Sequence, residues 1–272
     1  MRITADGRVV PISSVHFKNG EQRVTLDASV LGASCTIVES LAPNPDSRLV
    51  RLLLTIDALR ENGASHVRLV MPWMAYSLQN RHFDGEAVSA RAVARAISGS
   101  GVDEVVLVDI HAESCLTYFT VPVTNFSPLP QFVEYVTSHE LSTYTVVGPD
   151  KGSHVRAREL AKMTGTSVAL LTKKRDTATL NVSDFSLVEG ELGETCLLVD
   201  DAVNSGSTIV GVSRWLRTQG VKKIVWCVTH FLGVPGSLDI ILPEIDLLIT
   251  TDSVEHGLKT QGKIVVVPLR LS

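Results

Sequence analysis

The sequence predicts an α/β protein made of two tandem domains, each with a mostly parallel sheet flanked by helices. Short runs rich in β-branched residues alternate with helical patterns along most of the chain, as in parallel strands joined by crossover helices. The length of 272 residues accommodates two domains of ordinary size. An apolar strand ends in Val-Asp once in each half, at Val108-Asp109 and at Val199-Asp200. This repetition indicates two related halves.

The first half contains three predicted strands, at 35–39, 66–71 and 104–109. A helix is predicted between the first two, because apolar residues recur there with the period of one helix face: Leu49, Leu52, Leu53, Ile56 and Leu59. Asp46 and Ser47 are its predicted N-caps, and Gly63 is its predicted stop. A further helix is expected at about 86–98.

The second half contains four predicted strands, at 144–148, 167–171, 195–200 and 223–229. Helices are predicted between them at about 154–164 and 207–219. Residues 121–130 contain three prolines, which cannot continue a helix or a central strand. We expect this segment to approach the domain boundary, and we assign the domains to 1–138 and 139–272.

Composition excludes several classes of function. With 44% hydrophobic and 20% charged residues, and with no apolar run of about 20 residues, the chain is predicted to be soluble and to lack a membrane span. The first residues are too polar for a secretion signal, so a cytoplasmic location is expected. A net charge of -4 argues against nucleic acid as a partner. The four cysteines lack CxxC spacing and are predicted to be buried thiols.

The segment from Leu197 to Thr208 carries the strongest functional signal. An apolar strand leads into Asp200 and Asp201, at the end of a strand, where ligands bind in open α/β sheets. Two carboxylates there can accept hydrogen bonds from the vicinal hydroxyls of a ribose. A small-residue loop then enters a helix, whose backbone N–H groups can bind a phosphate: Asn204, Ser205, Gly206, Ser207 and Thr208. The alternative is an acidic turn followed by an ordinary helix cap.

Several motifs in order, of which this loop is the last, resemble those of the ribose-phosphate pyrophosphokinases, also called PRPP synthetases. The resemblance covers about residues 16–255 and rests on His16–Glu21, Pro72–Arg81, Val108–Glu113, Gly148–Gly152, Lys173–Arg175 and Asp200–Thr208. It implies two domains of the type I phosphoribosyltransferase fold. It also implies Mg²⁺-dependent transfer of pyrophosphate from ATP to the anomeric hydroxyl of ribose 5-phosphate, giving phosphoribosyl pyrophosphate and AMP.

The resemblance also assigns roles to residues of the second half. Asp200 and Asp201 would hold the ribose hydroxyls, and Asn204 to Thr208 the 5-phosphate. Lys173 and Arg175 would stabilise charge during transfer, a role that suits phosphoryl chemistry. From the residues alone, this basic cluster is a solvated loop.

The resemblance places two residues near magnesium, His111 of the first half and Asp150 of the second. Magnesium prefers oxygen ligands and retains waters. His111 is otherwise a satisfied residue at the end of a strand. Gln79 and Arg81 would reach the ATP phosphates, and without the resemblance they are surface residues after a strand.

A nucleotide-base loop is implied at Phe17, Asn19 and Glu21, and in the family a neighbouring subunit contributes it. The chain is therefore expected to form a homo-oligomer, a dimer or higher. A buried Phe beside a turn explains Phe17 nearly as well.

The sequence departs from the family at several of these positions. Leu78 replaces the usual arginine, and Asn80 replaces the usual acid. Asn19 replaces the aspartate of the base loop, and Asn204 the acid that often opens the phosphate loop. Both ends look short against the family, which is expected to alter subunit packing.

Three alternatives to ribose 5-phosphate activation stay open at this point. One is the same chemistry on a larger ribose 5-phosphate derivative such as ADP-ribose. Another is a phosphoribosyltransferase that consumes the activated sugar. The third is a non-catalytic relative that binds nucleotide and regulates an active partner.

Overall fold

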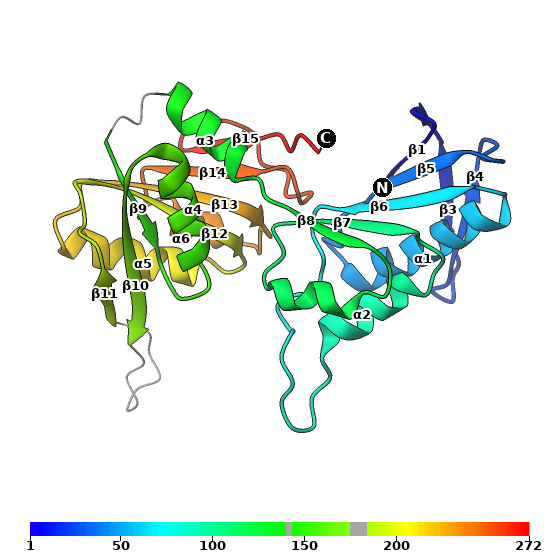
Figure 1. Cartoon of the computed structure of the whole chain (residues 1–272), viewed down its shortest axis with the longest axis horizontal. Helices are drawn as coiled ribbons and strands as arrows, with labels where there is room; N and C mark the ends of the chain where they lie inside the picture. The colour runs from blue at the N-terminus through cyan, green and yellow to red at the C-terminus, as the bar shows by residue number, and fades with distance from the viewer. Residues whose placement is uncertain (140–142, 175–183, 272) are drawn as a thin grey trace. The chain divides into compact units, whose positions relative to one another are not determined.

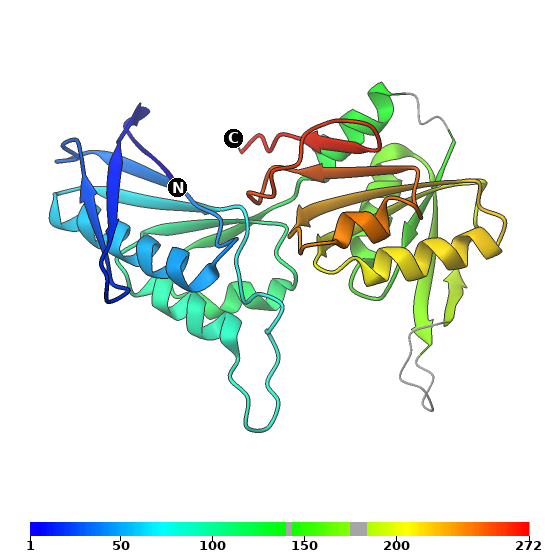
Figure 2. The same cartoon turned by 180° about the vertical axis from the view of Figure 1, so that it is seen from behind.

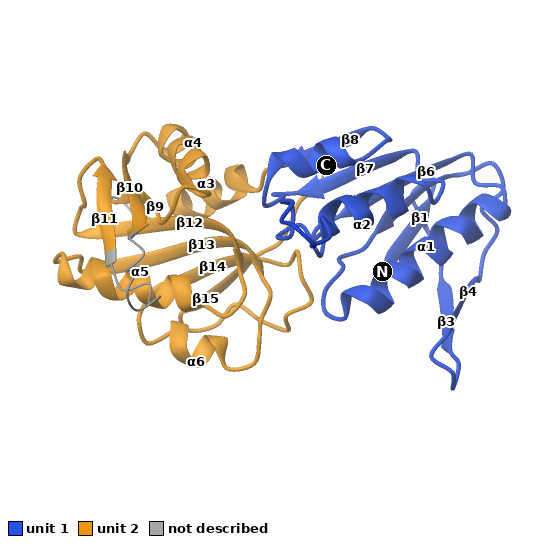
Figure 3. Cartoon of the chain, turned by 90° about the horizontal axis from the view of Figure 1, so that it is seen from below, with its two compact units in different colours: residues 1–126 blue, residues 127–272 orange. Residues whose placement is uncertain are grey.

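Two sheets of mostly parallel strands organise the chain, each in its own unit (Figure 3). The computed structural model describes residues 1–139, 143–174 and 184–271. Its two compact units are Met1–Phe126 and Ser127–Ser272. The division falls before helix α3 (Leu129–Ser138), whereas the sequence places it at 138/139. The reason is that α3 buries Leu129, Phe132 and Val136 in a core cluster of the second unit.

The first unit has a six-stranded sheet in the order β2-β1-β5-β6-β7-β8. Its strands are β1 (Arg2–Ala5), β2 (Arg8–Val9), β5 (Ser34–Val38), β6 (His66–Met71), β7 (Glu104–Val108) and β8 (Val123–Phe126). The four strands from β5 to β8 run parallel, and β1 is antiparallel to both of its neighbours. Helices α1 (Pro45–Glu61) and α2 (Ser89–Ser98) lie on one face of this sheet (Figure 1). A separate hairpin joins β3 (Ile12–His16) to β4 (Gln22–Leu26).

Helix α1 begins earlier than the sequence predicts. Its N-cap is Asn44, with a left-handed φ of 62°, and Pro45 occupies the first helical position. The predicted caps Asp46 and Ser47 therefore lie inside the first turn, because proline's fixed φ favours the start of a helix. The predicted stop is close to the observed end, since the helix ends at Glu61 and Gly63 follows with φ 84°. The predicted apolar face is confirmed by the burial of Leu52, Ile56 and Leu59.

The second unit has a seven-stranded sheet in the order β11-β10-β9-β12-β13-β14-β15. Its strands are β9 (Thr145–Gly148), β10 (Ser167–Lys174), β11 (Asp184–Glu189), β12 (Thr195–Val203), β13 (Lys223–Phe231), β14 (Leu247–Thr251) and β15 (Ile264–Val267). All neighbours pair in parallel except β10 and β11.

Helices cover both faces of the second sheet, which the near-continuous apolar runs of its strands require. One face packs against α5 (Ser207–Thr218) and α6 (Ser237–Ile241), and α5 is seen along this face in Figure 2. The other face packs against α3 and α4 (His154–Thr164). The four cysteines are free and buried, as predicted. Among the helices described, none is long and apolar enough to cross a bilayer.

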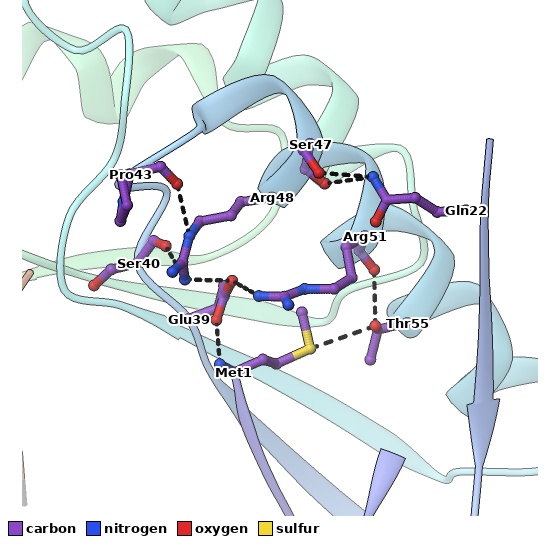
Figure 4. Close-up of polar contacts among 9 residues, drawn as sticks. All are labelled: Met1, Gln22, Glu39, Ser40, Pro43, Ser47, Arg48, Arg51 and Thr55. Atoms are coloured by element: carbon purple, nitrogen blue, oxygen red, sulfur yellow. Dashed lines mark hydrogen bonds and ion pairs between the residues drawn. The ribbon is translucent and has the colours of Figure 1, made fainter. Parts of the chain in front are cut away.

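A buried carboxylate holds the start of the first unit together (Figure 4). Glu39, directly after β5, is only 2% exposed. Its Oε2 lies 2.7 Å from the α-amino nitrogen of Met1, and its Oε1 lies 3.1 Å from Arg48 Nη1 and 2.5 Å from Arg51 Nη2. Arg48 also donates from Nε to the carbonyl oxygen of Pro43 at 2.8 Å. The ion pairs therefore connect β1, the end of β5 and α1.

We expect Glu39→Gln to lower the free energy of unfolding by about 3 kcal/mol, because it leaves one buried amino group and two partly buried guanidinium groups without a counter-charge. Urea denaturation would measure the loss. The control is Glu104→Gln, whose side chain is 40% exposed and pairs with Arg68, so its cost should stay below about 1 kcal/mol. Equal losses in the two variants would contradict a special role for Glu39.

Candidate functional site

The candidate site of the second unit lies where the parallel strands β9, β10 and β12 end. Asp150 comes two residues after β9, and Lys173 is the last residue but one of β10. Asp200 and Asp201 lie near the end of β12. Parallel strands bring such residues to the same edge of a sheet, where ligands of open α/β folds bind. In each unit, we call the edge of the sheet at which the parallel strands end the carboxyl edge.

A tight turn holds the Asp150 carboxylate in place. Its Oδ1 accepts hydrogen bonds from the backbone N–H groups of Gly152 at 3.1 Å and Ser153 at 3.3 Å. Ser153, which is fully buried, donates from Oγ to the Asp150 carbonyl oxygen at 2.8 Å and accepts from the Asp150 N–H at 3.1 Å. Sequence reasoning did not single out Ser153, although a serine three residues after an aspartate is a typical turn signal.

Lys173 connects the Asp150 turn with the small-residue loop. Its Nζ lies 3.3 Å from Asp150 Oδ2 and 3.4 Å from the Thr208 hydroxyl oxygen. Three predicted residues from separate segments are thus brought together. The side chains of Lys173 and Asp150 are each about one-third exposed, at 31% and 32%, so both remain accessible to a ligand. The predicted partner Arg175 lies outside the described residues.

The two adjacent aspartates crowd negative charge into the end of β12. Burial, followed by the nearby charges of Asp201 and Asp150, raises the pKa of Asp200 well above its usual range. The Arg156 guanidinium, in the first turn of α4, acts on that pKa in the opposite direction. Asp201 is buried, and its N–H donates to Asp200 Oδ1 at 3.0 Å. Sequence reasoning missed Arg156, whose only signal was its place one turn after the Asp150 loop.

The small-residue loop enters α5 through a left-handed glycine. Gly206 is the N-cap of α5 with φ 84°, and a Cβ at this position would lie 2.5 Å from Ile241 Cδ1. Ser205 Oγ hydrogen-bonds to Ser207 Oγ at 3.2 Å. The Ser207 N–H donates to Ser205 Oγ at 3.5 Å, and no other hydrogen bond from a described side chain reaches the N–H groups of the first turn of α5, so those that remain can bind an anion. The predicted loop Asn204 to Thr208 therefore has the geometry of an anion-binding helix start.

In the first unit, unusual backbone conformations gather at the carboxyl edge. Three non-glycine residues with left-handed φ follow successive parallel strands: Asn44 at 62° after β5, Tyr76 at 68° after β6 and Asp109 at 42° after β7. Conformations of this kind cost free energy and concentrate at functional sites. The turn at Asp109 is held by Asn125, whose Oδ1 accepts from the Ile110 N–H at 3.0 Å. The predicted residue His111 follows this turn and is exposed.

The other predicted residues of the first unit fall into two groups. Gln79 and Arg81 lie in the loop between β6 and α2, and both are exposed. Phe17, Asn19 and Glu21 lie in the turn of the β3–β4 hairpin, where Asn19 Nδ2 donates to Glu21 Oε2 at 2.9 Å. Phe17 is 43% exposed, so the alternative that it is buried beside a turn is wrong.

Asp150 is the candidate metal ligand that the structure holds in a fixed position. Within the described parts of the chain, no group of three or more His, Cys, Asp or Glu side chains could hold a metal ion. Asp150 offers one anchored carboxylate, a donor that Mg²⁺ accepts together with waters and phosphate oxygens. The residues present therefore fit a magnesium ion that arrives with a phosphorylated ligand.

Comparison with known proteins identifies relatives over nearly the whole chain. Residues 4–101 match the N-terminal domain of ribose phosphate pyrophosphokinase, and residues 134–237 match the phosphoribosyl transferase domain. A ribose-phosphate pyrophosphokinase of Methanopyrus kandleri is 37% identical over 92% of this chain and 86% of its own. One from Vibrio parahaemolyticus is 32% identical over 93% and 82%. The crystal structure of phosphoribosylpyrophosphate synthetase from Mycobacterium smegmatis superposes with a TM-score of 0.87 at 28% identity, covering 97% of this chain and 87% of that one.

Gly206→Ala should destabilise the protein more than Gly220→Ala. The two glycines flank α5 with similar positive φ values, 84° and 89°, so both variants incur the left-handed penalty of about 1 kcal/mol. Only at position 206 would the added methyl group also meet Ile241, a contact expected to cost about 1–3 kcal/mol more. Thermal and urea unfolding measure the difference. If the two variants lose the same stability, Ile241 does not constrain the loop.

Asp200→Asn should stabilise the protein at neutral pH. Because the folded-state pKa of Asp200 is raised, the stability linked to its proton is present below about pH 4 and is lost as the pH rises through the folded-state value. An asparagine cannot ionise, so the variant avoids this loss of stability, which amounts to about 1.4 kcal/mol for each unit by which the pKa is raised. Urea denaturation at acidic and neutral pH tests this. The control is Asp239→Asn, because Asp239 is exposed and its replacement should not raise the free energy of unfolding. If Asp200→Asn stabilises the protein equally at acidic pH, the raised pKa of Asp200 is not the cause.

Proposed function

The chain belongs to the ribose-phosphate pyrophosphokinase family, and we propose that its carboxyl-edge residues transfer pyrophosphate from ATP to the anomeric hydroxyl of ribose 5-phosphate. As an enzyme of that family it forms phosphoribosyl pyrophosphate, with AMP as the second product. The observation that carries the residue assignment is the placement of Lys173 Nζ between Asp150 and Thr208.

The second unit supplies the groups that bind the sugar phosphate. Asp200 and Asp201 accept hydrogen bonds from the ribose hydroxyls, a role that suits carboxylates. The N–H groups from Asn204 to Thr208, with the hydroxyls of Ser205, Ser207 and Thr208, bind the 5-phosphate at the start of α5. The raised pKa of Asp200 supports this assignment, because donors from the sugar would relieve the crowding of carboxylates.

The reaction needs positioning and charge stabilisation. The anomeric oxygen forms a bond to the β-phosphorus of ATP while the bond from that phosphorus to the α–β bridging oxygen breaks. AMP leaves with the electron pair of that bond, and the hydroxyl proton is released. Lys173, together with Arg175, stabilises the negative charge on the transferring group. His111 keeps the role that the family resemblance implies for it, that of a residue near magnesium.

Magnesium would be held by Asp150 together with phosphate oxygens and waters, and when bound it would neutralise phosphate charge. The Asp150 carboxylate is paired with Lys173, so Asp150 already lies beside a cation. Removal of Mg²⁺ by EDTA is expected to abolish turnover.

The first unit supplies the nucleotide-binding groups. Arg81 is exposed and has no ion-pair partner among the described residues, so its guanidinium is available to the ATP phosphates. Gln79 lies two residues earlier in the same loop. Phe17, Asn19 and Glu21 contact the base of a nucleotide bound to a neighbouring subunit, which requires a homo-oligomer. A cytoplasmic location remains a prediction from the sequence.

A specific observation favours one alternative, in which the acceptor is larger than ribose 5-phosphate. Leu78, at the position of the family's arginine, is 44% exposed, so the nucleotide loop presents an apolar side chain there. This supports testing a larger acceptor such as ADP-ribose. An AMP-release assay with ATP, Mg²⁺ and a panel of ribose phosphates decides: faster release with ribose 5-phosphate supports the main proposal, and faster release with ADP-ribose supports the alternative. Folded protein that releases no AMP with any acceptor would overturn both.

Lys173→Ala is expected to lower kcat by about 100-fold to 1000-fold, because a charge that stabilises the transition state is lost. AMP release at saturating substrates measures the effect. The matched control is Lys222→Ala, since Lys222 is an exposed lysine paired with Glu194 at 2.6 Å and should be dispensable. Unchanged turnover in Lys173→Ala would show that this lysine is not part of the catalytic machinery.

A further inference from the structure

The loop segment Ser77–Arg81 of the first unit is held from two sides by residues outside it. On one side, Ser89 Oγ, at the first position of α2, donates to the side-chain oxygen Oε1 of Gln79 at 2.7 Å. The backbone of Gln79 is also tied to α2, because the N–H of the next helical residue, Ala90, donates to the Gln79 carbonyl oxygen at 3.2 Å. Gln79 is therefore attached to the start of α2 through both its main chain and its side chain.

On the other side, the short helix η1 (Glu113–Tyr118) holds the loop. Tyr118 donates from Oη to the carbonyl oxygen of Asn80 at 2.9 Å, and the thiol of the fully buried Cys115 lies 3.8 Å from the carbonyl oxygen of Ser77. The backbone of the loop is thus fixed on both flanks of Gln79. What remains to be set is the direction of the Gln79 amide.

We propose that Ser89 is a positioning residue that orients the Gln79 amide for nucleotide binding. This inference rests on the proposed function, in which Gln79 contacts ATP. A primary amide has an acceptor oxygen and a donor NH₂ group at opposite ends. Because the Ser89 hydroxyl engages the oxygen, the NH₂ group points away from α2. Among the described residues it has no hydrogen-bond partner.

The orientation of the Gln79 amide determines which ligand groups it can bind. An outward NH₂ group can only donate, so it matches the acceptor oxygens of a polyphosphate and opposes a ligand that presents donors. Arg81, two residues later, is also a pure donor, so the loop presents donors to an anion from two side chains. Without Ser89 the amide can turn over, and nucleotide binding must then fix its orientation at a cost in affinity.

The test compares Ser89→Ala with Ser89→Thr, which keeps the hydroxyl. We expect Ser89→Ala to raise the KM for ATP, and the Kd for a non-transferable ATP analogue, by about threefold to tenfold, the usual worth of one hydrogen bond. The kcat and the KM for ribose 5-phosphate should stay within about twofold, and Ser89→Thr should restore ATP binding. The matched control is Ser100→Ala, at the other end of α2, where Ser100 Oγ donates to the Ile97 carbonyl oxygen at 2.7 Å.

A double-mutant cycle with Gln79→Ala decides whether Ser89 acts through Gln79. If it does, Ser89→Ala has no further effect on analogue binding once Gln79 is alanine. An equal effect of Ser89→Ala in both backgrounds, an equal effect of Ser100→Ala, or unchanged binding in Ser89→Ala would overturn the proposal. Because analogue binding is measured without turnover, wild-type protein that binds the analogue but releases no AMP would refute the transfer reaction and leave this inference standing.

Discussion

Crowding of carboxylates at the carboxyl edge of the second sheet is the constraint on which the rest of the site depends. Burial, followed by the nearby charges of Asp201 and Asp150, raises the pKa of Asp200. Lys173 and Arg156 offset part of the negative charge of these aspartates. Under the proposed function, ribose hydroxyls would supply hydrogen-bond donors to these carboxylates and magnesium would supply a further cation. The ionised form of Asp200 therefore lowers the stability of the fold at neutral pH.

The loops at the carboxyl edges of the two units are shaped by different physical means. In the second unit, a helix start and a glycine with no room for a side chain shape the loop. In the first unit, three left-handed non-glycine residues turn the chain away from β5, β6 and β7. Such turns persist only where the surroundings hold them, and the Glu39 ion pairs and the η1 contacts serve that purpose next to Asn44 and the Gln79 loop.

Much of the architecture could be predicted, and the misses have identifiable causes. Apolar runs such as 195–200 and the helical period in α1 located the central elements, since burial on a sheet or helix face imposes a strong pattern. The edge strands β2 and β8, the short strand β1 beside β2 and the helix α6 have little apolar pattern and were not predicted. The unit boundary was displaced because α3 resembles a linker in sequence, with Pro128 and Pro130 at its start, yet packs as a core helix.

The sequence by itself determined the α/β class, the two-part organisation and the contiguous loop from Asp200 to Thr208, because each depends on residues that are neighbours along the chain. Only the tertiary structure decided that Lys173 lies between Asp150 and Thr208 and that Ser89 orients Gln79. Those contacts join segments 10 to 35 residues apart. They depend on strand register and on the direction in which each side chain leaves the backbone, and neither is encoded in a local pattern.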